Sequence, residues 1–461
     1  MALLTNILEP RRGLEPSRQK FSNRALVGLI VPILGEQLLT LLVGLADTMM
    51  VSYAGEAAVS GVSLVNQLNT VFLYIFGAAA SGGAVVASQY VGRKDRQSGV
   101  NAASQLLMIT AVISLAAMLV SLLFCRQLLG LLFGRVESDV MDACITYLVI
   151  SGLSFPALAA YNSVSALFRS MGRTRTVMYV SIGMNLLNMA GNAVGIFVLH
   201  AGVAGVAVPS LLSRLFAAAV LLRLSFSRKN SLYIDLHRVF AWDREMLRRI
   251  LHIAVPNGIE SGLFQLSKVA LSSIAALFGT VEIAANGVAQ SFWSVAALFT
   301  VSFGYVFVTV IGQCMGAGDI EAADYYSRKL LRMTYLGAAL WNLLILALTP
   351  PLLTLYSLSP ETKRLLLLLV VIHNAGNALL APLAFPLSNG LRAAGDVRYT
   401  MFAAIFATVI CRVLLSVAFG IWLRLGVMGI AIAMVCDWLI KAALIWLRYR
   451  SGRWTRFHVI D

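Results

Sequence analysis

Two stretches of this chain, 224 positions apart, carry the same residues in the same order, and this internal repeat constrains the fold more than any other feature. Each copy holds a proline, a carboxylate, a glycine and a Gln-x-x-Gly-x-x-Asp motif within 64 residues. A single offset shared by so many residue types indicates two homologous halves, each opening with an apolar segment that contains an acid. The copies comprise Val31, Pro32, Glu36, Gly55, Gln89, Gly92 and Asp95, and Val255, Pro256, Glu260, Gly279, Gln313, Gly316 and Asp319.

The composition places both halves in a membrane. Of 461 residues, 59% are apolar and only 12% are charged, and the mean hydropathy is +0.82. A soluble protein has too little interior to bury that much apolar surface. Apolar runs of about 20 residues recur along the whole chain, as membrane-spanning helices require. Strands of a membrane barrel would alternate with a period of two, and these segments do not.

We therefore expect an all-α polytopic membrane protein with twelve transmembrane helices in two pseudo-symmetric six-helix lobes. Because both halves begin on the same side, they form a parallel repeat, and transporters of that kind bind substrate between the halves. The chain then divides into a cytoplasmic N-terminal tail (1–24), an N-lobe of spans 1–6 (25–225), a cytoplasmic interlobe loop (226–247), a C-lobe of spans 7–12 (248–448) and a cytoplasmic C-terminal tail (449–461). The spans are expected at 25–53, 58–91, 100–125, 139–168, 175–200, 203–225, 248–278, 283–315, 326–355, 362–390, 396–423 and 426–448.

The distribution of lysine and arginine predicts the orientation. One side of the membrane receives 27 of these residues, in both tails and in alternate loops. The positive-inside rule therefore places both termini in the cytoplasm. The protein is expected in the cell inner (plasma) membrane. Residues 1–24 have no apolar signal-peptide core, so the first span is expected to act as the insertion signal. The other side receives five basic residues, Arg126, Arg135, Lys363, Arg364 and Arg424.

The net charge of +15 does not indicate a nucleic-acid partner, because the basic residues cluster at alternate ends of apolar segments. The expected partners are the lipid bilayer and small-molecule substrates, and the chain is expected to act as a monomer. Five cysteines without CxxC spacing predict neither a disulfide framework nor a metal site. The sequence has no nucleotide-binding, zinc-protease or serine-hydrolase motif. We therefore expect neither an enzyme nor a cofactor, and an ion gradient would supply the energy for transport.

Acids inside the spans mark candidate functional positions, because a charge in the hydrocarbon layer costs at least about 2.5–3.5 kcal/mol. Glu36 and Asp47 lie eleven residues apart in span 1, on one helix face but at two depths. The alternative for Glu36 is a packing role near a kink at Pro32. The alternative for Asp47 is an interfacial carboxylate that water reaches. Pro32 and its repeat counterpart Pro256 are the candidate hinges.

Span 5 carries Asn185, Asn188 and Asn192 on one helix face. Alone, these amides could simply hydrogen-bond a neighbouring helix. Together with Asp47 they predict an oxygen-rich cage for a proton or Na⁺, and we expect no other metal site.

The second half carries a different set of polar residues. Glu260 and Lys268, with Gln265 between them, differ by about 80° in direction around span 7, so they are not expected to pair with each other. Lys268 is instead expected to find an acid on another span. Arg412 and Asp437, on the adjacent spans 11 and 12, are expected to form an ion pair.

Four segments, together with the two six-span halves, resemble those of the MATE (multidrug and toxic compound extrusion) transporters over about residues 20–450. These segments are GLADTMMVSYAGEAAVSGVSLV, ASQYVGRKD, IGQCMGAGD and FPLSNGLRAAGDVRYTM. The resemblance implies a V-shaped pair of lobes and antiport of organic cations against H⁺ or Na⁺. It also implies that Asp47 takes the coupling cation, with Asn188 and Asn192 as its polar partners. Family members with a second cation site use acids in spans 7 and 10. Span 10 here contains no acid, although span 7 contains Glu260.

The leading functional hypothesis is a secondary active antiporter that exports organic, cationic and amphipathic compounds in exchange for H⁺ or Na⁺ by alternating access. The alternative is a lipid-linked oligosaccharide flippase of the same superfamily, which would favour arginines in spans 1, 2, 7 and 8. Those spans contain only Lys268 between their ends. A non-transporting receptor or scaffold is a third class, which the costly buried acids disfavour. Asp47 has no counterpart in the second half, where position 271 is leucine, so coupling is expected in the first lobe.

Overall fold

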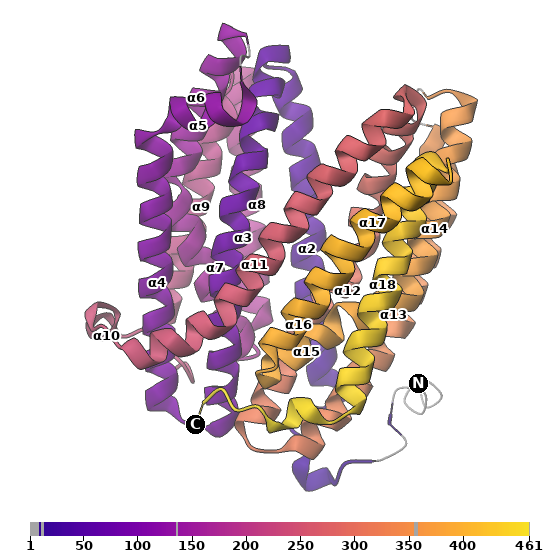
Figure 1. The fold of residues 1–461 in the computed structure, drawn as a ribbon. Helices are drawn as coiled ribbons and strands as arrows, with labels where there is room; N and C mark the ends of the chain where they lie inside the picture. Colours follow the sequence, from indigo (N-terminus) through magenta and orange to yellow (C-terminus); the bar gives the residue numbers. More distant parts are fainter. Residues whose placement is uncertain (1–8, 11–12, 135–136, 355–357, 461) are drawn as a thin grey trace. The chain divides into compact units, whose positions relative to one another are not determined.

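The computed structural model describes residues 9–10, 13–134, 137–354 and 358–460, and in these residues the chain is helical with no strand (Figure 1). Short π-helical stretches, η2 (Val194–Val198), η4 (Ile405–Cys411) and η5 (Val417–Trp422), continue three of the helices. The α-helices are α2 (Asn23–Ser52), α3 (Glu56–Arg93), α4 (Arg96–Leu123), α5 (Cys125–Phe133), α6 (Ser138–Leu153), α7 (Phe155–Ser170), α8 (Thr174–Ala193), α9 (Ala204–Ser225), α10 (Leu236–Phe240), α11 (Arg244–Ala275), α12 (Thr280–Gly316), α13 (Ile320–Thr354), α14 (Pro360–Ala384), α15 (Pro386–Ala394), α16 (Val397–Ala404), α17 (Arg412–Ser416) and α18 (Gly426–Arg450).

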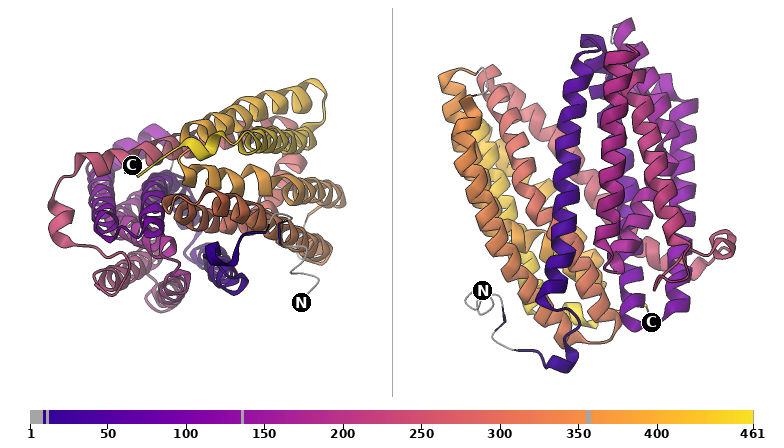
Figure 2. Two further views of the ribbon diagram at one scale, coloured as in Figure 1. Left: turned by 90° about the horizontal axis from the view of Figure 1, so that it is seen from below. Right: turned by 180° about the vertical axis from the view of Figure 1, so that it is seen from behind.

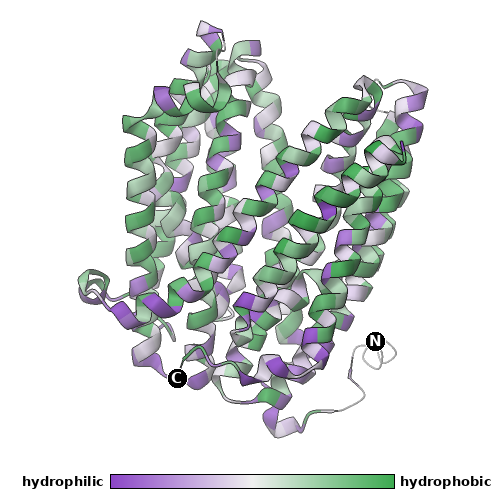
Figure 3. Cartoon of the chain, in the orientation of Figure 1, coloured by the Kyte–Doolittle hydropathy of each residue, from purple (hydrophilic) through white to green (hydrophobic). Residues whose placement is uncertain are grey.

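The helices are long and apolar enough to cross a membrane. In the described part of the chain eleven helical segments qualify, and the number becomes twelve when the bent pair α6 and α7 is counted as one span. Hydrophobic residues dominate the middle of the helices in Figure 3. The bend of 46° lies at Ser154, where Pro156 in the first turn of α7 has no amide hydrogen to continue the helix. The prediction of an all-α protein with twelve spans in two lobes is confirmed, and span 4 is a broken helix.

The chain forms two compact units, and each holds most of one half. Unit 2 comprises Val27–Gly258, and unit 1 comprises Met1–Leu26 and Ile259–Asp461. In unit 2, α3 packs against α4, α6 and α7, and α9 packs against α7 and α8 (Figure 2). In unit 1, α12 packs against α13, α14 and α15, and α18 packs against α14 and α17.

The units divide inside α2 and α11 rather than at the lobe boundaries expected at residues 25 and 248. The first half of α11 lies in unit 2, because Asn257 Nδ2 donates to Ser81 Oγ at 3.0 Å and Gly82 leaves room for the backbone of Ile250. The tail segment before α2 lies in unit 1, because the Arg18 side chain binds Asp319 with an N–O distance of 2.5 Å. The cytoplasmic placement of the tails and the loop stays a prediction.

The two units repeat the same local conformations. Their apolar cores use repeat-related positions, since Val51, Val65 and Val206 in unit 2 correspond to Ala275, Ala289 and Ile430 in unit 1, each 224 positions later. Repeat-related turns also share a positive φ, a conformation that L-residues other than glycine rarely adopt. These φ pairs are Gly55 and Gly279 (103° and 99°), Lys94 and Gly318 (61° and 71°), His200 and Arg424 (49° and 54°), and Gly202 and Gly426 (55° and 59°).

Candidate functional site

A cluster of Asp47 with two asparagines lies between α2 and α8 in unit 2. Asn192 Nδ2 donates to Asp47 Oδ1 at 2.7 Å. The Asn188 amide satisfies its neighbours only with its nitrogen toward Asp47. In that orientation it donates to both carboxylate oxygens at 3.1 Å, and its oxygen accepts from Ser210 Oγ at 2.9 Å. The spacing of four residues places both amides on one face of α8. The three residues predicted to take the coupling cation are therefore in contact.

The surroundings of this cluster suit a group that exchanges a small cation. Asp47 is half-buried, whereas Asn192 is fully buried and its Oδ1 has no hydrogen-bond partner in the described chain. Arg214 of α9 attracts the carboxylate electrostatically, while its Nη1 donates to Ser154 Oγ at 2.6 Å. The cluster therefore combines an acid that solvent reaches with an unused amide oxygen, and these are groups that accept a proton or ligate Na⁺.

The third predicted amide, Asn185, does not join this cluster. Its Nδ2 donates to Ser181 Oγ of the same helix at 3.3 Å. The counterpart of Asp47 in the second half, Leu271, packs against the apolar core of unit 1. Asp47 therefore has no acidic counterpart in the second half, although the surrounding sequence is repeated.

Glu36 has a different environment from Asp47, although both belong to α2. It is 4% exposed, and its Oε1 accepts from Arg169 Nη2 at 2.6 Å and from the Tyr161 hydroxyl at 3.3 Å, both on α7. The sequence reasoning missed Arg169 as the partner. A signal was present, because Arg169 recurs with the repeat as Arg392. The paired arginine makes Glu36 an ion-pair residue that links α2 to α7.

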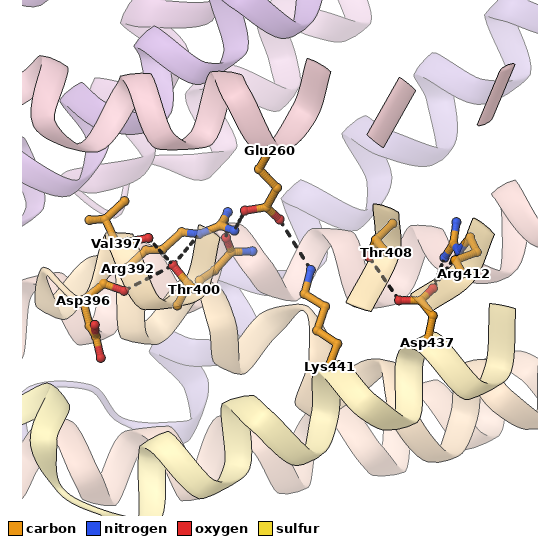
Figure 4. Close-up of polar contacts among 10 residues, drawn as sticks. Glu260, Arg392, Asp396, Val397, Thr400, Thr408, Arg412, Asp437 and Lys441 are labelled. Atoms are coloured by element: carbon orange, nitrogen blue, oxygen red, sulfur yellow. Dashed lines mark hydrogen bonds and ion pairs between the residues drawn. The ribbon is translucent and has the colours of Figure 1, made fainter. Parts of the chain in front are cut away.

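Glu260 forms the corresponding contact in unit 1. Its carboxylate accepts from Arg392 at the end of α15 and, at 3.4 Å, from Lys441 Nζ of α18 (Figure 4). Lys441 adds a second cation, whereas in the described residues of unit 2 the corresponding ion pair of Glu36 is with Arg169. Gln265, one and a half turns further along α11, is half-buried and belongs to none of the ion pairs in the described residues.

The predicted pair of Arg412 and Asp437 is confirmed. Arg412 Nε donates to Asp437 Oδ2 at 2.6 Å, and Thr408 Oγ1 donates to Oδ1 at 3.0 Å (Figure 4). Asp437 is fully buried. Both oxygens of this buried carboxylate therefore have a hydrogen-bond partner, one of them its own cation.

The prediction that Lys268 finds an acid on another span is wrong for the described residues. Its ammonium lies over two aromatic rings instead, 5.3 Å from the centroid of Phe264 and 5.8 Å from that of Trp293. The reason is that Glu260 and Asp437, the acids that lie away from the helix ends in the described spans of unit 1, already bind other cations.

The candidate hinges Pro32 and Pro256 both lie inside helices that continue without a break, α2 and α11. Each proline removes one backbone hydrogen bond from its helix, so the helix bends more easily at that point. Their role as hinges stays a prediction.

Comparisons with known proteins agree with the organisation of the chain as two repeated halves. A family model described as MatE matches residues 32–194 and again 256–418, two matches that are offset by the same 224 positions as the repeat. The chain is 29% identical over 447 residues to YisQ, an uncharacterized transporter of Bacillus subtilis, with 95% of this chain and 96% of the relative covered. It is 24% identical over 447 residues to NorM of Thermotoga maritima, a probable multidrug resistance protein, with 95% and 94% covered. The fold matches an outward-facing multidrug resistance MATE family transporter of the MOP superfamily with a TM-score of 0.87, at 20% identity, over 94% of this chain and 96% of that one.

Proposed function

The chain belongs to the MatE family of multi-pass membrane transporters, and on that premise we propose that it is an antiporter driven by an ion gradient. It exports organic, cationic and amphipathic compounds in exchange for H⁺ or Na⁺ by alternating access. It acts as a monomer with both termini in the cytoplasm. The bias of lysine and arginine toward one side of the predicted spans supports that orientation. A transporter of this family is not an enzyme.

The observation that carries the proposal is the contact of Asp47 with Asn188 and Asn192. In the arrangement described above, both amides donate to the carboxylate, which suits the ionised acid. A proton removes the charge that these donors stabilise. Na⁺ binds oxygen ligands and would need the amides to turn their oxygens inward. Either ion thus rearranges the contact between α2 and α8, and this is the change that couples ion binding to the state of the lobe.

A transport assay tests this directly. Purified protein in liposomes is given either a proton gradient or a sodium gradient, each imposed separately, and efflux of a fluorescent organic cation is followed. We expect efflux with one of the two gradients and none without either. Asp47→Asn should abolish the gradient-driven component. Asp142→Asn, which changes an exposed acid on α6, is the matched control and should transport like wild type. Undiminished gradient-driven efflux in Asp47→Asn would refute the assignment.

The flippase alternative is tested in the same liposomes. A lipid-linked oligosaccharide that crosses the bilayer only when the protein is present, while the organic cation does not move, would replace the exporter by that function. The comparisons give the flippase no support over a multidrug transporter.

A further inference from the structure

Lys268 is a cation inside a membrane span with no acid bound to it among the described residues of its unit. A charge at that depth costs at least about 2.5–3.5 kcal/mol unless a partner or water compensates it. The residue is half-buried. A residue of this kind marks a candidate functional position by default, and its two aromatic neighbours compensate only part of the cost.

The interiors of the described spans of unit 1 contain more cations than anions. Away from the helix ends, these spans hold the acids Glu260 and Asp437, and both are already bound. Glu260 binds Arg392 and Lys441, and Asp437 binds Arg412. Arg412 also lies over the Phe264 ring, 5.6 Å from its centroid, so two cations share one aromatic ring. This part of unit 1 therefore has an unbalanced positive charge at Lys268.

Among the described residues, two indole N–H groups in this part of unit 1 also lack a hydrogen-bond acceptor. Trp293 and Trp438 stack with their centroids 6.2 Å apart, and neither indole N–H has an acceptor in the described chain. An indole N–H can only donate, and so can an ammonium. Lys268 lies over the ring of Trp293. The ammonium and the indole N–H groups can donate hydrogen bonds to an anion, and the aromatic rings beside them can pack against an aromatic ligand. Together these groups are complementary to an aromatic molecule that carries an anionic group.

We propose that Lys268, with Phe264 and Trp293, forms a subsite for the anionic group of an aromatic organic acid. The carboxylate accepts from the ammonium, and the aromatic body packs against the two rings. The subsite rests on the proposed transport function and extends its substrates from organic cations to aromatic carboxylates and to zwitterions that carry one. It lies wholly within unit 1, whereas the cluster of Asp47 lies within unit 2.

A pair of probes that differ only in charge tests the subsite. The full-length protein is placed in nanodiscs of neutral phosphatidylcholine, and binding of 1-pyrenebutyrate is compared with binding of 1-pyrenebutanol. We expect wild type to bind the carboxylate about tenfold more tightly than the alcohol, which corresponds to about 1.4 kcal/mol. Added salt should weaken only the carboxylate. Equal affinity for the two probes in wild type would overturn the subsite without any variant being needed.

Variants then assign the preference to Lys268. Lys268→Gln should lose the tenfold preference and bind both probes like the alcohol, whereas Lys268→Arg should keep most of it, since a guanidinium also binds a carboxylate. Lys229→Gln, which removes an exposed lysine of the connecting loop, is the matched control and should bind like wild type. If Lys268→Gln keeps the preference, or loses both probes equally, the subsite is wrong.

The failure of this subsite and that of the transport proposal are separate outcomes. Gradient-driven efflux of an organic cation without any preference for pyrenebutyrate would leave the antiporter standing and remove the subsite. Preferential binding of pyrenebutyrate without any gradient-driven efflux would support the subsite and refute the antiporter.

Discussion

Arg169 donates to Glu36 across unit 2, and the repeat-related residues Arg392 and Glu260 form the same ion pair in unit 1. The first pair joins α2 to α7, and the second joins α11 to α15, so each pair links the first span of its half to the corresponding later helix. Both glutamates are largely buried, with side chains 5% and 17% exposed. In each unit this ion pair therefore links the first span to a second helix. A movement of the first span relative to that helix would have to break the pair.

Removing one glutamate should destabilise the protein and impair transport, although both variants still insert into the membrane. Glu36→Gln removes the acid that Arg169 Nη2 binds, and the loss of one partner of a buried pair costs about 3–5 kcal/mol. Glu260→Gln leaves both Arg392 and Lys441 uncompensated and should cost more. Thermal unfolding of the detergent-solubilised variants, followed by size-exclusion chromatography, measures the difference, and efflux measures transport.

The double variant Glu36→Gln with Arg169→Gln is the control for that prediction. It removes the whole pair, so it should be less destabilised than Glu36→Gln alone. If instead the two losses simply add, Glu36 and Arg169 contribute independently and the pair has no structural role.

The sequence alone predicts which positions correspond, but it does not say which positions touch. The repeat revealed Glu36 with Glu260 and Arg169 with Arg392, yet it could not join them, because about 130 residues of intervening chain decide which helices become neighbours. Pairs on adjacent spans, such as Arg412 with Asp437, were within reach of sequence reasoning.

Lys268 shows the other limit of the sequence. The expectation that it pairs with an acid treated each buried charge separately. The outcome depended on competition, because the cations of unit 1 outnumber the acids that could bind them. In the cluster of Asp47, i, i+4 spacing predicts that Asn188 and Asn192 share a helix face, whereas their partnership with Asp47 followed from the resemblance to MATE transporters.

Asn192→Leu should remove most of the gradient-driven efflux. The variant keeps the size of the side chain but loses the amide that donates to Asp47 at 2.7 Å. Ser210→Ala is the matched control, because Ser210 touches the cluster only through Asn188 and should matter much less. Initial rates of efflux from liposomes under the effective gradient give the comparison. Equal rates in the two variants would mean that Asn192 only packs α8.

The acids that end the two Gln-x-x-Gly-x-x-Asp motifs both cap a helix outside the membrane spans. Asp95 accepts from the Ser98 amide at the start of α4, and that hydrogen bond lowers the pKa of its carboxyl. Asp319 accepts from the Ala322 amide at the start of α13 in the same way. Burial raises the pKa of Asp319, but its hydrogen bonds with Arg18 and the Ala322 amide, together with the positive charge of Arg18, outweigh burial and lower the pKa.

The two caps should therefore differ in how mutation and pH affect stability. Asparagine caps a helix about as well as aspartate, so Asp95→Asn should change the unfolding temperature little. Asp319→Asn also loses the ion pair with Arg18 and should unfold at a lower temperature near pH 7. A carboxyl with a lowered pKa stabilises the fold above its unfolded value, near 4, and loses that effect as the pH falls through its folded pKa.

The deficit of Asp319→Asn should accordingly be constant from about pH 7 to pH 5. It should begin to shrink below about pH 4, where the unfolded acid is protonated, and vanish only below the lowered pKa of the folded acid. Unfolding temperatures measured at a series of pH values in one detergent check this. A deficit that grows in acid would contradict the ionised state of Asp319 in the fold.

Two repeat-related glycines in the first turns of α9 and α18, Gly205 and Gly429, should resist substitution. A Cβ on Gly205 would lie 2.7 Å from the backbone oxygen of Gly195, and one on Gly429 would lie 2.6 Å from the backbone nitrogen of Gly420. These neighbours are backbone atoms in π-helical stretches, η2 and η5, so they cannot turn aside as a side chain would. Gly205→Ala and Gly429→Ala should each destabilise the protein, by about 1–3 kcal/mol as is usual for overpacking.

Gly130→Ala provides the matched control for this pair. Gly130 is an exposed residue inside α5, and a Cβ there would meet no other atom within 4 Å. Alanine favours a helix over glycine by up to about 1 kcal/mol, so this variant should be as stable as wild type or slightly more stable. Unfolding temperatures of the three variants in one detergent test the contrast. Because the two turns share their backbone conformation, similar losses are expected at Gly205 and Gly429, and a loss at only one of them would show that the symmetry of the turns does not extend to their packing.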